Sequence, residues 1–236
     1  MLQIERAETE HMTLYGGETL HLAPLRAVYA GEGLPVNVAI GFGTGHDALA
    51  QLPVLERFYA ERGQPARLVV YSHAHPDVLQ ALGARGYRQV RSLNVYHHPL
   101  TSLPPLRAQP VRLASPQAFL ATVIAGFGPG SEPIMQRTAL RAHTQLYVCE
   151  LDGQPVAAGA LSVLGGVGLL YSAATRPEAR GRGAQTALLV TRLHAARAAG
   201  ARSAAVLTAP GSASERNILR AGFQLVGERW SLEREA

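Results

Sequence analysis

The chain has 236 residues, enough for one large hydrophobic core or two smaller ones. Its composition, 47% hydrophobic and 17% charged, is typical of a globular protein and excludes a disordered chain, and no apolar run reaches the roughly 18 residues that a membrane span requires. The formal net charge is +5, and all 22 basic residues are arginines scattered along the chain; a nucleic-acid-binding face would cluster them with aromatic residues, so we expect no nucleic-acid or membrane partner.

The start of the chain and its cysteine content bear on the compartment. The stretch 1–8 is charged and lacks the apolar core of a signal peptide. Cys149 is the only cysteine, which excludes an intrachain disulfide. The cytoplasm, which is reducing, is therefore the simplest location.

The first half of the chain predicts an alternation of strands and helices. Residues 1–30 show little pattern beyond a short alternation at 20–25, which is compatible with a strand. Further on, apolar runs and helical spacing predict strands at 36–41, 66–72 and 89–96, and helices at 48–62 and 76–85. Asp47 is suited to cap the first of these helices, whereas Pro53 fits it only in a first turn that starts near Gln51.

A proline-rich connector at 101–110 leads into a second half with more elements. The same signals predict strands at 111–113, 145–151, 155–164, 167–174 and 204–208, helices at 117–124, 133–142 and 184–199, and a closing hairpin of 223–226 with 230–232. Asp152-Gly153 supplies a hairpin turn, and Ser115 is suited to cap the helix 117–124. Ser212 or Ser214 caps a further helix, which follows the strand 204–208.

The stretch Arg180-Gly-Arg-Gly-Ala-Gln185 joins the strand 167–174 to a long helix. Gly181 and Gly183 let the backbone approach a ligand closely and adopt conformations closed to other residues. Free amides at the helix N-terminus, together with the two arginines, would form a site for a phosphate or pyrophosphate. The alternative is a plain joint whose glycines only make the turn. The stretch is neither a P-loop nor the dinucleotide Gly-x-Gly-x-x-Gly motif.

This corner, followed by Thr-Ala-Leu-Leu, resembles the acetyl-CoA loop of the GNAT acetyltransferase superfamily, Gln/Arg-x-x-Gly-x-Gly/Ala. Two further pieces follow in the order of that family, the strand Ala204-Ala-Val-Leu-Thr208 and the helix Asn217-Ile-Leu-Arg-Ala-Gly-Phe223 with its Gly-Phe ending. The resemblance covers roughly 111–236. It implies an α/β fold with a mixed (α+β) sheet, of the acyl-CoA N-acyltransferase type.

The resemblance also implies a set of contacts to acetyl-CoA. In the family, the strand before the loop splays from its neighbour, and its free backbone groups hold the pantetheine arm. Carried onto this chain, the cofactor-binding residues are Ser172, Ala173, Ala174, Thr175, Arg180, Gly181, Arg182, Gly183, Ala184, Gln185 and Asn217. For Asn217, a position on the helix surface without a ligand is the alternative.

Two residues depart from the family pattern. Gln185 stands where the pattern has Gly or Ala, which is tolerated if its side chain points away from the ligand. Ile218 stands four residues before Gly222, where many members carry a Tyr that protonates the leaving thiolate. The general acid is therefore unassigned.

Acetyl transfer to an amine requires a polarised carbonyl, an amine that loses a proton and a stabilised thiolate. Tyr171 and Glu150 are the candidate catalytic residues, because both lie on predicted strands that could face the site; His143 is a third. A structural role is the alternative for each, and water can also take the proton. We do not expect Cys149 to act as a nucleophile, since direct transfer needs no covalent step.

Two histidine pairs, His73-Ala-His75 and His97-His98, raise the question of a metal. A metal site needs a third or fourth ligand at a fixed geometry, and none is evident in the sequence. We therefore expect no metal.

The first half repeats the order of the second half. A shift of 136 residues places 48–62 on 184–198 and Gly86-Tyr87 on Gly222-Phe223 without a gap. Two α/β segments of coincidental spacing are the alternative. Thr44-Gly-His-Asp47 then falls on the glycine corner, without its arginines and with an added negative charge. We therefore expect that the first copy does not bind coenzyme A.

The sequence thus predicts two tandem GNAT-like units, a degenerate domain at 1–100, a linker at 101–110 and an acetyl-CoA-binding domain at 111–236. The expected activity is direct transfer of an acetyl group from acetyl-CoA to a primary amine of a small molecule or peptide. The alternatives are another acyl or aminoacyl transferase of the tandem type, and a non-catalytic coenzyme A-binding module. The acceptor, the acyl-chain preference and the oligomeric state, a homodimer included, are left open.

Overall fold

The computed structural model describes residues 1–43 and 46–234. The chain divides into two compact units, one formed by residues 1–95 with 226–236 and the other by residues 96–225. This division differs from the predicted domains mainly at the C-terminus, because the last strand belongs with the first unit. Both units combine helices with strands that pair in parallel and antiparallel, so the predicted mixed α/β class is confirmed.

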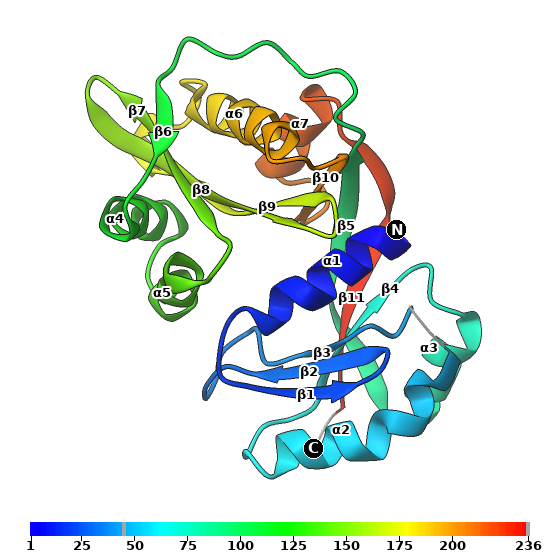
Figure 1. The fold of residues 1–236 in the computed structure, drawn as a ribbon. Helices are drawn as coiled ribbons and strands as arrows, with labels where there is room; N and C mark the ends of the chain where they lie inside the picture. The colour runs from blue at the N-terminus through cyan, green and yellow to red at the C-terminus, as the bar shows by residue number, and fades with distance from the viewer. Residues whose placement is uncertain (44–45, 235–236) are drawn as a thin grey trace. The chain divides into compact units, whose positions relative to one another are not determined.

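The first unit alternates short strands and helices (Figure 1). Its elements are α1 (Leu2–Thr13), β1 (Glu18–Leu22), β2 (Leu25–Tyr29), β3 (Ala39–Ile40), the 3₁₀ helix η1 (His46–Gln51), α2 (Leu52–Ala60), β4 (Arg67–Tyr71), α3 (Pro76–Ala84), most of β5 (Tyr87–His98) and nearly all of β11 (Gln224–Arg234). The strand order is β1-β2-β3-β4-β11-β5. Strand β3 runs parallel to β4, whereas β11 runs antiparallel to it.

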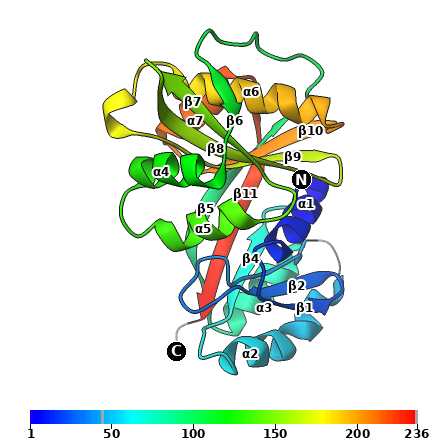
Figure 2. The same cartoon turned by 60° about the vertical axis from the view of Figure 1, so that its left-hand side comes forward.

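Helices cover both faces of this sheet (Figures 1 and 2). Side chains alternate between the faces of a strand, and Leu68 and Val70 of β4 pack in the core that α2 and α3 cover. Tyr71, the next residue, points to the other face, where its hydroxyl group donates a hydrogen bond to Glu8 of α1. The order of helices and strands thus encloses one core between α2, α3 and the sheet.

Four elements of the first unit differ from the predictions. Residues 2–13 form a helix that the sequence does not signal, because small and polar residues such as Ala7 and His11 occupy much of its buried face. The alternation at 20–25 belongs to two strands that turn at Ala23-Pro24, and the strand expected at 36–41 shrinks to β3. The predicted helix at 48–62 begins as η1 and becomes α2, with Pro53 in its first turn.

The degenerate corner predicted at Thr44-Gly-His-Asp47 is not tested by the structure. Thr44 and Gly45 lie outside the described residues, as do the side chains of His46 and Asp47.

Glu5 is a carboxylate buried inside the first unit. The Gly43 amide donates a hydrogen bond to its Oε1 at 3.0 Å, and His73 Nε2 lies 2.9 Å from its Oε2. A Cβ at Gly43 would lie 2.3 Å from Glu5 Oε2, so the close approach requires glycine there. Burial raises the pKa of Glu5 from 4.5 to about 7, with the Gly43 hydrogen bond opposing the change and the Glu8 charge adding to it.

Replacement of Glu5 by Gln is expected to stabilise the fold at high pH only. Because the folded-state pKa lies above the unfolded value, the stability contributed by Glu5 is complete below about pH 4.5 and is lost as the pH rises through about 7. Gln should therefore change little at pH 5 and raise the free energy of unfolding at pH 8 by up to about 3 kcal/mol. Denaturant unfolding at both pH values measures this, with Glu10→Gln on the exposed side of α1 as control. A difference that is the same at both pH values would contradict the prediction.

The second unit contains the stretch that resembles an acetyl-CoA loop. Its elements are the end of β5, β6 (Val111–Leu113), α4 (Pro116–Phe127), α5 (Glu132–Leu140), β7 (Gln145–Leu151), β8 (Gln154–Leu164), β9 (Val167–Thr175), the 3₁₀ helix η2 (Pro177–Ala179), α6 (Ala184–Ala198), β10 (Ser203–Thr208) and α7 (Ala213–Arg220). The strand order is β5-β10-β9-β8-β7-β6, with β10 parallel to β9 and the strands from β9 to β6 antiparallel.

The sheet of the second unit has a helix pair on each face (Figures 1 and 2). On one face, Phe119 of α4 and Met135 of α5 pack against Val148 of β7. On the other face, Leu188 of α6 and Ile218 of α7 belong to a second apolar core. The strands β8 and β9 are buried between these two layers, as their nearly continuous apolar sequences require.

Most of the elements predicted for the second half are confirmed. Ser115 and Ser212 cap their helices, accepting hydrogen bonds from the Ala118 and Glu215 amides at 3.3 and 3.1 Å. The closing hairpin is wrong, because residues 224–234 form the single strand β11. Gly227 does not turn the chain, which stays extended where Arg229 to Glu233 pair with β4.

The 136-residue shift predicted from the sequence also relates the bounds of helices and strands in the two halves of the chain. Adding 136 to the bounds of β4 gives 203–207, against 203–208 for β10, and adding it to those of α3 gives 212–220, against 213–220 for α7. The same shift takes β5 to 223–234, against 224–234 for β11. Strand β11, which comes last in the second half of the chain, lies beside β4 in the first unit, whereas only the end of β5 belongs to the unit of β10.

Within the described part of the chain, no helix combines the length and the apolar character that a membrane crossing requires.

Candidate functional site

Strand β9 carries a bulge directly before the glycine corner. Its pairing with β8 passes from Tyr171 opposite Ala160 to Ala174 opposite Ala158, so that Ser172 and Ala173 together oppose Gly159. Ser172 has a φ of 47°, in the left-handed region, as one residue of such a bulge commonly does. The bulge interrupts the ladder and redirects the backbone groups of these two residues.

On its other side, β9 parts from β10. The parallel pairing runs from Val167 with Ser203 to Leu169 with Ala205, while β9 continues to Thr175 and β10 to Thr208. Within the described residues, the second half of β9 thus has no ladder partner on this side. Its backbone groups on this side take no part in a strand ladder and can bond a ligand, except the Tyr171 and Thr175 carbonyl oxygens, which accept hydrogen bonds from Arg192 and Arg180.

The glycine corner turns the chain from β9 into α6. Gly181 and Gly183 have φ values of 79° and 83°, which glycine adopts without strain, and Gly183 is the residue that caps α6. The cap has no side-chain hydrogen bond. Among the described residues, Arg180 and Ala187 donate backbone hydrogen bonds, but no amide from 181 to 186 does. The helix N-terminus therefore presents a run of unbonded amides, as an anion site requires.

A pocket of about 520 Å³ opens at this corner. The walls come from α4, β9, the corner itself, α6 and α7. Its lining residues are Gly126, Phe127, Ala173, Ala174, Thr175, Ala179, Arg180, Gly181, Gly183, Ala184, Gln185, Thr186, Ala213, Ser214, Asn217 and Arg220.

Nine of the eleven predicted cofactor contacts line this pocket, and the other two do not. Ser172 lies in the bulge just before the lining stretch of β9. The Arg182 guanidinium donates to Asp152 at 2.8 Å, at the β7–β8 turn. Arg180 reaches over the pocket, where Nη2 lies 3.3 Å from the Gly126 carbonyl oxygen. Gln185 accepts a hydrogen bond from the Thr175 hydroxyl at 3.1 Å, so its side chain lies along the wall.

The pocket also has wall residues from α4 and α7 that were not among the predicted cofactor contacts. Gly126 lies in the last turn of α4 and packs closely against β9. A Cβ at this position would lie 2.6 Å from the Ala174 Cβ. Ser214 and Arg220 flank Asn217 by one helical turn on α7, and Arg220 Nη1 donates to Asn217 Oδ1 at 3.3 Å. Their spacing of three residues from Asn217 was the signal that could have found them.

The candidate catalytic residue Tyr171 lies on β9 next to the bulge. Its hydroxyl group lies 2.9 Å from the Thr144 Oγ1 and 2.9 Å from the Ser162 Oγ, and the Arg141 guanidinium lies 4.5 Å from its ring centroid. Tyr171 is thus part of a polar cluster on the α4–α5 face and does not line the pocket.

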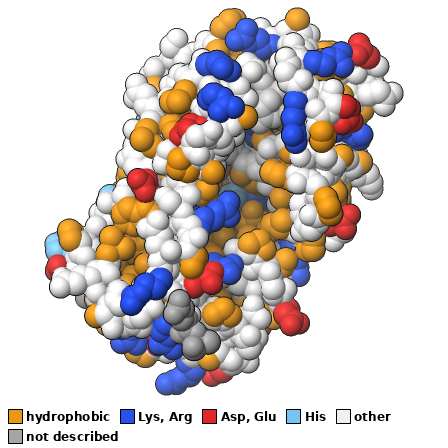
Figure 3. Space-filling model, turned by 180° about the vertical axis from the view of Figure 1, so that it is seen from behind, with side chains coloured by type: hydrophobic (Ala, Val, Ile, Leu, Met, Phe, Trp, Pro, Cys, Tyr) orange, Lys and Arg blue, Asp and Glu red, His pale blue; other side chains and the backbone are white. Residues whose placement is uncertain are grey.

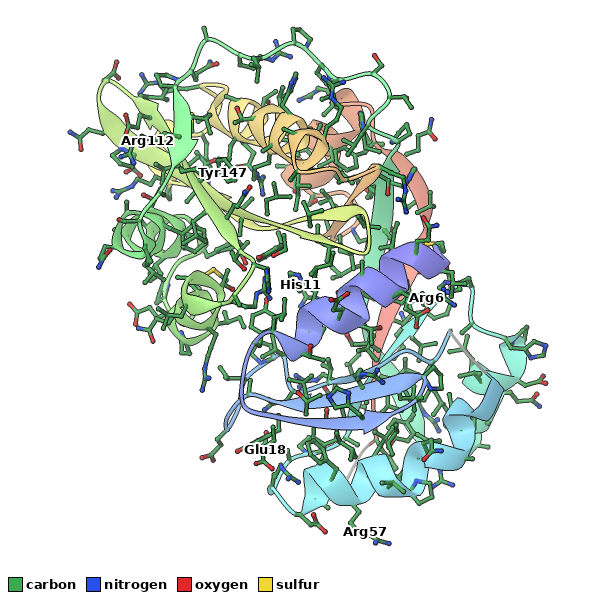
Figure 4. All side chains as sticks on the ribbon, in the orientation of Figure 1. Arg6, His11, Glu18, Arg57, Arg112 and Tyr147 are labelled. Carbon is green, nitrogen blue, oxygen red and sulfur yellow. The ribbon has the colours of Figure 1, made fainter. Side chains whose placement is uncertain are left out.

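Glu150, the second candidate, lies at the other end of the sheet. Its carboxylate accepts a hydrogen bond from Arg112 of β6 at 2.7 Å, and Figure 4 shows Arg112 at this outer edge. Glu150 pairs with Pro155 of β8 and Tyr171 with Ala160, so the two lie roughly 16 Å apart along that strand. The structure therefore does not bring Tyr171 and Glu150 together.

Other chemical roles find little support in the described residues. Burial raises the pKa of the Cys149 thiol to about 11, which keeps it protonated and poorly nucleophilic at neutral pH. Within residues 1–43 and 46–234, no group of three or more His, Cys, Asp or Glu side chains is arranged to hold a metal ion. On the face shown in Figure 3, arginine side chains are dispersed, with apolar and acidic side chains between them.

The sequence of residues 116–223 matches the model of a protein family described as the acetyltransferase (GNAT) family. The matched stretch begins at α4, ends just after α7 and includes the whole pocket wall. No curated protein matches the chain.

Three solved structures have a similar fold. A GCN5-related N-acetyltransferase from Kribbella flavida is 17% identical, with a TM-score of 0.78 over 100% of this chain and 95% of its own. A GNAT-family structure from Novosphingobium aromaticivorans is 17% identical, with a TM-score of 0.65 over 99% of both chains. A tandem GNAT protein from the clavulanic acid biosynthesis pathway is 13% identical, with a TM-score of 0.63 over 90% of this chain and 79% of its own. At these identities the likeness concerns the fold alone.

Proposed function

Because residues 116–223 match the model of the acetyltransferase (GNAT) family, we propose that the chain is an acetyl-CoA-dependent N-acetyltransferase. Its acceptor would be a primary amine of a small molecule or peptide. The observation that carries the proposal is the run of unbonded amides at 181–186, at the mouth of a pocket of about 520 Å³. A structural joint would not need an open pocket at its amides.

The residues present fit coenzyme A. The amides of Gly181 to Gln185 and the Arg180 guanidinium would hold its diphosphate, since unbonded helix amides and a cation favour the same anion. The unpaired edge of β9, from Ala173 to Thr175, would hold the amides of the pantetheine arm. Asn217 would contact the arm from the opposite wall.

Acetyl-CoA supplies an acetyl group bound as a thioester, which an amine can attack directly. The redirected backbone amides of the β9 bulge would polarise the thioester carbonyl, because fixed N–H donors stabilise an oxygen that gains negative charge. Of the two predicted proton acceptors, Tyr171 adjoins the bulge, but its hydroxyl group contacts Thr144 and Ser162 outside the pocket, so the amine would lose its proton through water. Glu150 lies too far along the sheet to accept this proton.

One observation favours a non-catalytic coenzyme A-binding module instead. Ile218 is buried in the apolar core of the second unit, so no acidic side chain stands at this position to protonate a leaving thiolate. Such a module would bind coenzyme A without catalysing acetyl transfer.

Calorimetry with acetyl-CoA, followed by an assay for thiol release with a panel of amines and peptides, tests the proposal. We expect binding with a dissociation constant of roughly micromolar to millimolar size, and thiol release that depends on an amine. Other acyl-CoAs and an aminoacyl-tRNA, offered as donors, separate the related transferases. Absence of binding would contradict the proposal, and binding without release on any amine would favour the module.

A further inference from the structure

Arg192 is a cation buried in the core of the second unit. It lies on α6, is 1% exposed and is among the largest fully buried side chains of the described residues. Its Nε donates to the Leu188 carbonyl oxygen at 3.2 Å, and its Nη1 to those of Ala160 and Tyr171 at 3.0 and 3.4 Å. All three hydrogen bonds leave from Nε and Nη1, so none of them uses Nη2.

The surroundings of Arg192 are built to contain it. Gly159, which opposes the β9 bulge, leaves room for the Arg192 guanidinium. A Cβ at position 159 would lie 2.8 Å from both Cζ and Nη1 of Arg192. None of the ion pairs among the described residues includes Arg192. Its acceptors are neutral carbonyl groups, which satisfy hydrogen bonds but leave the charge uncompensated.

Arg192 is charged at neutral pH. Burial lowers its pKa to about 10, while Tyr147 and Tyr171 act in the opposite direction. Tyr147 comes from β7, as Figure 4 shows. An uncompensated buried charge is costly, so its retention calls for a partner that carries negative charge at some stage.

A small cavity of about 30 Å³ lies next to Arg192 where β9 and β10 part. Its lining is apolar except for Arg192, Gln185, Ser214 and Asn217, and it contains no acidic side chain. Ala173, Gln185, Ser214 and Asn217 also line the large pocket, so the two adjoin. Ile218 lines the small cavity as well. The part of the site next to Arg192 therefore offers one cation and no acidic side chain.

We propose that Arg192 stabilises the negative charge that develops on the leaving sulfur, which makes an acidic side chain at position 218 unnecessary. This inference rests on the proposed function. In the transfer, the amine nitrogen bonds to the acetyl carbon, the carbon–sulfur bond breaks and its electron pair stays on sulfur. The amine proton passes to water. A guanidinium with free donor capacity beside a small cavity that has no acidic side chain favours the sulfur anion over the neutral thiol.

The titration of coenzyme A bound to the protein tests the role of Arg192 without turnover. The thiolate absorbance is followed against pH, with desulfo-coenzyme A as blank, for the natural protein, Arg192→Met and Arg192→Lys. Cys149 does not interfere, because burial raises its pKa to about 11. We expect the bound thiol to ionise at least about one pH unit below the free coenzyme in the natural protein, as cations do for cysteine thiols. Arg192→Met should abolish this shift, and Arg192→Lys should keep part of it.

The outcomes separate this inference from the proposed function. If coenzyme A does not bind at all, the proposed function fails and the inference fails with it. If it binds, but its thiol ionises in the natural protein as it does in free solution, the inference alone is overturned. This second arm needs no variant, so it decides the matter even if Arg192→Met does not fold. An equal shift in the natural protein and in a folded Arg192→Met variant would overturn the inference as well.

Discussion

Replacement of Arg180 by Glu is expected to weaken the binding of acetyl-CoA at least about a hundredfold. Arg180 lines the pocket, and its guanidinium reaches across the mouth to the Gly126 carbonyl oxygen at 3.3 Å. Hydrogen bonds to charged groups contribute about 1.5–3 kcal/mol, and about 1.4 kcal/mol corresponds to a factor of ten in affinity. The new carboxylate adds repulsion toward the diphosphate. Isothermal titration calorimetry with acetyl-CoA measures the loss.

Two further arginine variants control this experiment. Arg137→Glu changes the net charge equally but lies on the exposed side of α5, outside the pocket, so binding should be unchanged. Arg182→Glu should have an intermediate effect, because the Arg182 side chain is bonded to Asp152 at 2.8 Å and contributes only its long-range field. Equal losses for Arg180→Glu and Arg137→Glu would mean that net charge, and no specific contact, governs binding.

Removal of residues 226–236 is expected to unfold the first unit. The deletion takes away the strand between β4 and β5, the Arg67–Glu233 ion pair at 2.5 Å and the buried Leu232. The apolar core of the first unit, which contains Leu68 and Val70, would then lose one of its walls. Circular dichroism and limited proteolysis should show a first unit without protection, and a synthetic peptide of residues 224–234 should restore part of it.

A pair of single substitutions in β11 gives the same information with less disruption. Leu232→Asp places a charge in the first core and should cost at least about 3 kcal/mol. Leu225→Asp on the same strand, where the side chain is 55% exposed, should have little effect. A truncated chain that melts like the full one would contradict the assignment of β11 to the first unit.

The sequence was informative where local chemistry decides the structure. Gly181 and Gly183 predicted backbone conformations that other residues avoid, and both have positive φ. Ser115 and Ser212 predicted helix starts because capping is a contact within one turn. The strand 167–174 followed from a continuous apolar run, which a strand buried on both faces requires.

The missed features depend on residues far apart in sequence. Helix α1 has a buried face of small and polar residues, so its apolar periodicity is weak, and only Glu5 and Glu8, with partners in other elements, reveal its packing. The sequence of β11 was predicted to form a hairpin because the strand that it pairs with, β4, lies in the first half of the chain. The sequence around Arg192 predicts only an ordinary polar position on a helix, because Gly159 and the Ala160 carbonyl group, which surround its guanidinium, are far away in sequence.

Nuclear magnetic resonance of the amide groups, with coenzyme A titrated into the labelled protein, tests the central claim most directly. We predict that the largest chemical-shift changes occur at the amides of Gly181 to Gln185, which donate no backbone hydrogen bond in the structure. Pantetheine, which lacks the diphosphate, should not produce these changes. Coenzyme A binding that leaves these amides unchanged would contradict the assignment of the glycine corner as the diphosphate site.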